Sequence, residues 1–124
     1  MYIDAMNKSR DPWKGSTSVL ILATLAEAPR HGYAIAREIE RRSNALIAMG
    51  EGSLYPALMA LEREGLIVGE WVTPPAGGGP ARKVYTITDE GQGALAKRAK
   101  DVRALAETIA EMLRGVPDAS FSIG

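Results

Sequence analysis

Residues 50–65, GEGSLYPALMALEREG, decide how this chain folds. Leu54, Leu58 and Leu61 recur at i, i+4 and i+7, which is the spacing of one face of an α-helix, so we expect a helix that buries these leucines. A helix of this kind can pack on a core with one face and present the other face to a partner. That other face carries small, polar and aromatic side chains and ends in a cation: Ser53, Tyr55, Pro56, Met59, Ala60 and Arg63.

The ends of this helix are also marked in the sequence. Residues 50–53 open it, and Gly65 is typical of the residue just past a helix C-terminus. We expect Pro56 in the first turn, where backbone N–H groups have no intrahelical partner. Gly52 and Ser53 at the start would let an anion such as a phosphate approach the free N–H groups closely.

A first helix is expected upstream. Its apolar side chains recur at the helical period between residues 19 and 26, and it ends before Pro29. One of the hydroxyl residues 16–18 can cap its N-terminus, whereas Pro12 favours a break or a start further back. Trp13, in the arm before this helix, is a candidate for a dimer interface.

A second helix is expected at residues 32–42. Ile35 and Ile39, four residues apart, form its apolar face, and Arg37 and Arg41 share another face at the same spacing. These arginines either form a solvated face or contact a phosphate backbone. A short polar connection then leads to the third helix. Two helices joined in this way are typical of a helix-turn-helix.

A hairpin follows the third helix. Residues 66–73 and 83–88 are rich in β-branched and aromatic side chains, which favours strands. Between them, residues 74–81 (PPAGGGPA) cannot form regular structure and predict a mobile hairpin tip. Arg82 and Lys83 come just after this tip without an acidic neighbour, so we expect them to approach a phosphate backbone.

A long amphipathic helix closes the sequence. Thr88 is its candidate N-cap, and residues 91–114 carry a heptad-like apolar stripe that Arg98 interrupts. So long a stripe cannot be covered by so small a fold, so we expect it to join two copies of the chain. The candidate dimerisation residues, besides Trp13 of the arm, are Leu95, Val102, Leu105, Ile109, Met112 and Leu113.

This order of elements predicts a mainly α fold with a small β-hairpin wing: a winged helix-turn-helix followed by a long C-terminal dimerisation helix. Residues 1–88 would form the DNA-binding domain with its N-terminal arm, and residues 89–124 the dimerisation helix and tail. The major groove of DNA admits one helix, which must bury one face and present the other. The candidate DNA-binding residues are Gly52, Ser53, Tyr55, Pro56, Met59 and Arg63 of the third helix, Arg82 and Lys83 of the wing, and Arg37 and Arg41 of the second helix.

Composition is that of one domain with a modest core plus an appendage. Of the 124 residues, 46% are hydrophobic and 24% charged, with no cysteine and one histidine. No thiolate zinc site, catalytic triad or metal cluster can be assembled from this inventory, so we expect no metal, no cofactor and no enzymatic activity. We also expect a cytoplasmic protein, because the sequence has no signal peptide and no apolar run long enough to cross a bilayer.

The net charge is zero, from 15 basic and 15 acidic residues, which is unusual for a DNA-binding protein. Phosphate contacts need only a local basic stripe, so the distribution of charge matters more than its sum. We expect moderate, salt-sensitive affinity for DNA that depends on dimerisation. The zero net charge also leaves a second interpretation open: a winged helix that serves as a protein docking module.

Four blocks of the sequence, in order and at compatible spacing, resemble the PadR family of bacterial transcription regulators. They are residues 31–35 (HGYAI), 52–58 (GSLYPAL), 61–67 (LEREGLI) and 82–88 (RKVYTIT). The resemblance implies a homodimer, joined through the C-terminal helix and the N-terminal segment, that binds an inverted repeat in double-stranded DNA and represses transcription. A small-molecule effector is a further candidate partner.

The single C-terminal helix resembles the shorter subfamily. Some short members bind flat drugs between tryptophans of these helices at the dimer interface, but this helix has no tryptophan, so that activity is not expected here. Val84 stands where the family commonly has an aromatic residue, and the wing tip is longer than usual.

Four residues have alternative structural roles. We expect His31 at a helix start or turn and not as a metal ligand, because no second histidine or cysteine can join it. Tyr33 and Trp71 are expected in packing or in an interface. For Tyr55, packing and DNA contact are both plausible, and the resemblance favours contact.

Overall fold

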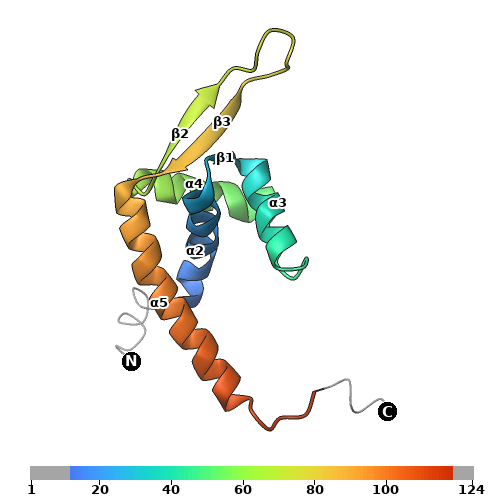
Figure 1. Cartoon of the computed structure of the whole chain (residues 1–124), viewed down its shortest axis with the longest axis vertical. Helices are drawn as coiled ribbons and strands as arrows, with labels where there is room; N and C mark the ends of the chain where they lie inside the picture. The colour runs from blue at the N-terminus through green and yellow to red at the C-terminus, as the bar shows by residue number, and fades with distance from the viewer. Residues whose placement is uncertain (1–11, 119–124) are drawn as a thin grey trace.

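The computed structural model describes residues 12–118 of the chain, and side chains from residue 15 onward (Figure 1). Strand β3 pairs antiparallel with both β1 and β2, which gives the sheet order β1-β3-β2. The predicted winged helix-turn-helix with a long C-terminal helix is confirmed. In chain order the elements are α2 (Pro12–Glu27), β1 (Arg30–His31), α3 (Gly32–Arg42), α4 (Glu51–Arg63), β2 (Ile67–Val72), β3 (Arg82–Ile87) and α5 (Asp89–Met112).

Helix α2 begins at Pro12, which confirms the alternative of a start there, and the cap expected among residues 16–18 is wrong. Proline suits the first helical position because its φ is already helical and its missing N–H would have no partner there. Ser18 does not cap the helix; its hydroxyl donates to the Gly15 carbonyl oxygen at 2.9 Å. Trp13 lies in the first turn, but its side chain is outside the described part of the structure, so its role in a dimer stays a prediction.

Helix α4 has the two faces that the sequence predicts. Leu54, Leu58 and Leu61 are each at most 2% exposed, which confirms the core face. The position of Pro56 differs from the prediction, because it is the sixth residue of the helix and not part of the first turn. Since proline has no N–H, the carbonyl oxygen of Gly52, four residues earlier, loses its donor within the helix.

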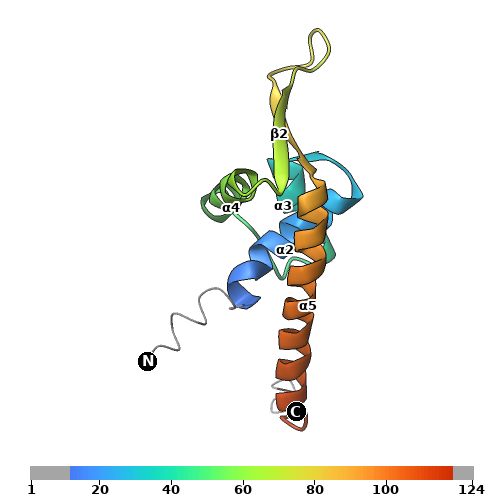
Figure 2. The ribbon, with the colours of Figure 1, turned by 90° about the vertical axis from the view of Figure 1, so that its left-hand side faces the viewer.

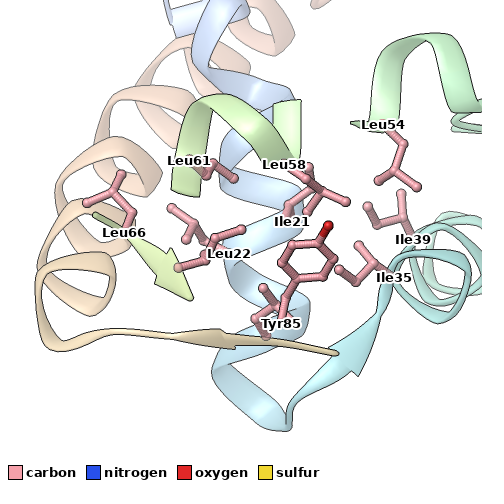
Figure 3. Close-up of a cluster of buried hydrophobic side chains, with 11 residues drawn as sticks. Ile21, Leu22, Ile35, Ile39, Leu54, Leu58, Leu61, Leu66 and Tyr85 are labelled. Atoms are coloured by element: carbon pink, nitrogen blue, oxygen red, sulfur yellow. The ribbon is translucent and has the colours of Figure 1, made fainter. Parts of the chain in front are cut away.

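The core lies where the three helices of the N-terminal part meet the sheet. Figure 3 shows Tyr85 pointing from β3 into the middle of this cluster, between Leu22 of α2 and Ile35 of α3. The core therefore fixes the position of α4 relative to α3 and to the base of the hairpin. Its buried members are Ile21, Leu22, Leu25, Ile35, Ile39, Leu54, Leu58, Leu61, Leu66, Ile67 and Tyr85.

The hairpin of β2 and β3 extends from this core as a wing (Figures 1 and 2). Its register pairs Ile67 with Ile87 at the base and Val72 with Arg82 at the far end. At the tip, the Gly78 N–H donates to the Pro75 carbonyl oxygen at 2.8 Å and closes a turn. Strand β1 was not expected from the sequence, because two residues are too few to show a strand period.

Helix α5 starts close against the core. The Thr88 hydroxyl accepts a hydrogen bond from the Gly91 N–H at 3.0 Å, which confirms the predicted cap. A Cβ at Gly91 would overlap the carbonyl oxygen of Leu66, so this glycine permits the close approach of the helix to the chain before β2. Arg98, which interrupts the heptad stripe, turns toward α2 and the end of α4. It donates to Ser18 Oγ at 3.0 Å and to Glu64 Oε1 at 3.2 Å.

The C-terminal half of α5 leaves the rest of the fold. Figure 1 shows the helix running past the end of α2, and Figure 2 shows α4 and α5 on opposite sides of α2. Met112 is 76% exposed and Leu113 57%. The four other candidate dimerisation residues of the helix are each half-buried: Leu95, Val102, Leu105 and Ile109.

Candidate nucleic-acid interface

The outer face of α4 is open to solvent. Met59 is 63% exposed and Tyr55 41%, and Gly52, Ser53, Pro56 and Arg63 are exposed as well. The six candidate residues of this helix therefore lie together on one accessible surface. At its N-terminus, the N-cap residue Gly50 makes no side-chain cap, so the first backbone N–H groups have no capping side chain.

Tyr55 connects α4 to the start of α3. A Cβ placed on Gly32, the first residue of α3, would lie 3.0 Å from the Tyr55 hydroxyl oxygen and 3.2 Å from the ring. The absence of a side chain at Gly32 thus makes room for the tyrosine, which packs with one edge and remains partly exposed with the other. Both roles weighed from the sequence are compatible with this position.

A groove of about 520 Å³ separates α3 and α4 from the wing. It brings together candidate residues that are far apart in the sequence, Tyr55 of α4 with Arg82 and Lys83 of β3. It also contains two aromatic residues that sequence reasoning did not place there: Tyr33, 62% exposed, and Trp71, 71% exposed. Of the two roles expected for these residues, packing in the core is therefore wrong, and a place in an interface stays a prediction. The lining residues are His31, Gly32, Tyr33, Tyr55, Trp71, Ala81, Arg82, Lys83 and Tyr85.

His31 lies at the N-terminus of α3, which confirms the helix-start role. Its Nδ1 accepts from the Ala34 N–H at 3.3 Å, and its Nε2 lies 3.0 Å from a guanidinium nitrogen of Arg82. Burial and the charge of Arg82 lower the pKa of His31 below its ordinary value. A neutral imidazole has one acceptor nitrogen, so one tautomer favours the cap and the other favours Arg82.

Arg37 and Arg41 of α3 differ in their partners. Arg37 donates to the Tyr33 hydroxyl at 3.0 Å and lies 5.5 Å from the centre of that ring. Arg41 is paired with the Glu38 carboxylate at 2.6 Å. Hydrogen bonds from Arg41 and Arg42 lower the pKa of Glu38 to about 2, so this carboxylate is ionised at neutral pH. Of the two candidates, Arg37 is held without neutralisation of its charge.

The two candidate cations of the wing also have partners. Lys83 pairs with Glu62 of α4 at 3.2 Å and lies 5.5 Å from the centre of the Tyr85 ring. This ion pair ties strand β3 of the wing to α4, which the sequence did not predict. Arg82 contacts the neutral His31 and keeps its net charge. Arg63 has no carboxylate within 4.0 Å among residues 15–118.

A second cleft, of about 510 Å³, lies beside the groove. Arg37 and Arg41 of α3 line it together with Arg30 of β1 and Arg82 of the wing, against one carboxylate, Glu38. The structure thus joins the candidate residues of α3 to those of the wing in one basic surface. Arg30 and Arg41 are paired with Glu27 and Glu38. Arg37 and Arg82 keep their charge, so this surface is locally positive although the net charge of the chain is zero.

The helix-turn-helix, the wing and this basic surface define a DNA-binding winged-helix protein. The model of the transcriptional regulator PadR-like family matches residues 21–97, and the chain belongs to this family. The resemblance seen in the sequence is thereby confirmed. Within residues 12–118, no helix is long and apolar enough to span a membrane.

Individual relatives agree with this assignment. Transcriptional regulator Rv3488 of Mycobacterium tuberculosis is 34% identical over 106 residues, which cover 86% of this chain and 91% of that protein. A transcriptional regulator from Clostridium thermocellum superposes with a TM-score of 0.73 at 25% identity, covering 84% of this chain and 96% of that one. Bacillus subtilis PadR, solved in complex with operator DNA, has a TM-score of 0.56 at 26% identity, covering 64% and 44% of the two chains.

Proposed function

We propose that this protein represses transcription as a homodimer bound to an inverted-repeat operator. The observation that carries the proposal is the separation of two unlike surfaces. The outer face of α4, the groove and the basic cleft lie together, while the apolar stripe of α5 lies elsewhere on the molecule and is only partly covered. A two-fold symmetric dimer of such winged helix-turn-helix units matches the symmetry of an inverted repeat.

In this proposal α4 enters the major groove. Ser53, Tyr55 and Met59 reach base edges or the sugar–phosphate backbone, and Gly52 and Pro56 keep the start of the helix free of bulky side chains. Arg63, in the last turn of α4, and Arg82, at the start of β3, supply positive charge for DNA phosphates. Lys83, Arg37 and Arg41 complete the set of candidate DNA-binding residues.

The dimer is proposed from the surface between α2 and α5. Val19, Ala23, Leu95, Ala99 and Val102 line a groove of about 560 Å³ there. The stripe continues beyond this groove to the exposed Met112 and Leu113. An uncovered apolar surface of this length is typical of an interface between subunits, and a second copy presents the same helix face.

Fluorescence anisotropy with labelled promoter DNA from the protein's own operon tests the proposal. We expect nanomolar affinity that falls steeply as salt rises, and much weaker binding to a scrambled duplex of equal length. Arg63→Ala should weaken operator binding at least tenfold. Arg114→Ala, at the exposed end of α5 and paired with Glu111, is the matched control and should not change it.

The outcomes separate this proposal from the docking interpretation. Operator binding that disappears in the Arg63→Ala and Lys83→Ala variants supports DNA recognition. If no promoter fragment binds, and a partner protein still binds both variants, the head is a docking module. The proposal also includes a small-molecule effector that releases the protein from its operator. Candidate effectors can be screened by adding them to the complex of protein and operator DNA.

A further inference from the structure

Trp71 lies on the face of the wing that turns toward the core, yet its side chain is exposed. Side chains alternate along β2, so Trp71 shares a face with Ile67 and Gly69. That is the face turned toward the core, since Ile67 is 1% exposed and a Cβ on Gly69 would approach Tyr85 and Glu62. At Trp71 the strand has passed beyond the core, and the indole is left 71% exposed over the groove.

The surroundings of Trp71 are aromatic and basic. Tyr33 from α3 and Tyr55 from α4 line the same groove, and all three rings are more than two-fifths exposed. Lys83 stands directly across from Trp71 in the strand pairing, and Arg82 lines the groove beside it. The three exposed rings line one groove, and a contiguous apolar surface of this kind is typical of a binding site.

We propose that this groove holds one sugar–phosphate strand of the operator, with the indole of Trp71 packed against a deoxyribose. This inference rests on the proposed function and adds Trp71 and Tyr33 to the residues that contact DNA. Such a strand alternates an apolar sugar face with an anionic phosphate. The groove offers the matching alternation, aromatic rings beside the guanidinium of Arg82.

The position of the groove agrees with this ligand. It lies between α4, which is proposed for the major groove, and the wing. Figure 2 shows the wing extending away from α4. Between those two contacts a duplex presents its backbone. Lys83 is already paired with Glu62, so Arg82 is the cation of the groove that is available to a phosphate.

Three variants test the inference by anisotropy with the promoter DNA. Trp71→Ala should weaken binding about tenfold, and Trp71→Phe, which keeps an aromatic ring, only about two- to threefold. Val68→Ala is the control, because Val68 is also exposed, lies on the opposite face of the strand and pairs with Thr86, away from Arg82, so it should bind as the parent protein does. Trp71→Ala removes no charge, so the slope of log Kd against log salt should not change.

Tryptophan emission gives a second, independent measurement. Addition of promoter DNA should change the emission of the parent protein, and this change should be absent in Trp71→Phe, which retains Trp13. Normal affinity of Trp71→Ala, or an unchanged emission while anisotropy reports binding, overturns the inference and leaves the proposed function intact. Failure of the parent protein to bind any promoter DNA overturns both.

Discussion

Arg82 of the wing lies 3.0 Å from Nε2 of His31, the residue that caps α3. The two residues are 51 positions apart in the sequence, and their contact ties β3 to the start of the helix-turn-helix. The guanidinium also opposes protonation of the imidazole. The state of the single histidine therefore reports on the position of the wing.

The pKa of His31 is the first prediction. In untagged protein, NMR titration of its imidazole should give a value below the ordinary one of about 6.5, because burial and Arg82 both disfavour the charged form. Arg82→Ala should raise the pKa of His31 but not restore it fully, since burial remains. An unchanged pKa in this variant would show that the two side chains do not interact in solution.

The same shift has a consequence for stability. Because folding lowers the pKa of His31, the unfolded chain binds more protons than the folded chain as the pH falls below about 6.5. The contribution of His31 to the free energy of unfolding is therefore complete above that pH and is lost as the pH falls through the folded pKa. Urea unfolding at a series of pH values, with His31→Asn as the reference, measures this contribution.

Gly32→Ala is predicted to affect DNA binding more than stability. The added Cβ would lie 3.0 Å from the Tyr55 hydroxyl, so the tyrosine must shift. Its ring is 41% exposed and can move outward, so the free energy of unfolding should change by less than about 1 kcal/mol. The displaced ring should weaken operator binding severalfold in the anisotropy measurement. Normal affinity would mean that the position of Tyr55 is not needed for recognition.

Two glycines near the start of α5 form a matched pair. Gly91→Ala would place a methyl group on the Leu66 carbonyl oxygen, and the backbone there cannot move aside cheaply. We expect the free energy of unfolding to fall by about 2 kcal/mol or more. Gly93→Ala meets no atom within 4 Å and should raise it by about 0.5–1 kcal/mol, as alanine favours a helix interior. Thermal unfolding at equal protein concentration should give a lower midpoint temperature for Gly91→Ala and a higher one for Gly93→Ala than for the parent protein.

Val102→Glu is predicted to disrupt the dimer. Val102 lies in the groove between α2 and α5, and the cost of removing a carboxylate from water in an apolar interface would oppose association. Light scattering coupled to size exclusion should report a monomer for this variant and a dimer for the parent protein. Ala104→Glu, an exposed position outside the stripe, is the control and should remain dimeric. A monomeric parent protein would contradict the proposed assembly.

The sequence predicts best those features that depend on a local period. The leucine face of α4, the cap at Thr88 and the hairpin follow from spacing and residue type, and the structure has each of them. The groove is different, because its members come from β1, α3, α4 and both wing strands. Trp71 could not be placed there without knowing the strand register, which pairs it with Lys83.

Ion pairs show the same limit. Spacing along one helix suggests the pair of Glu38 with Arg42, and the structure contains it at 3.0 Å. The pair of Lys83 with Glu62 joins residues 21 positions apart and depends on the packing of the wing against α4. A basic residue without an acidic neighbour in the sequence can therefore be paired with a carboxylate in the folded protein. Such a residue has less net positive charge to offer to a DNA phosphate.

Glu38→Gln tests whether Arg41 takes part in that binding. In the parent protein the Glu38 carboxylate, with its pKa of about 2, holds Arg41 at 2.6 Å throughout the neutral range. The variant keeps the shape of the side chain but removes its charge, so Arg41 is released into a cleft that Arg37 and Arg82 also line. If this cleft faces the operator, binding should tighten severalfold at low salt, and the slope of log Kd against log salt should steepen by about one. Combining the change with Arg41→Ala should cancel most of the gain, whereas a gain that survives would assign it to Arg42, the other partner of Glu38.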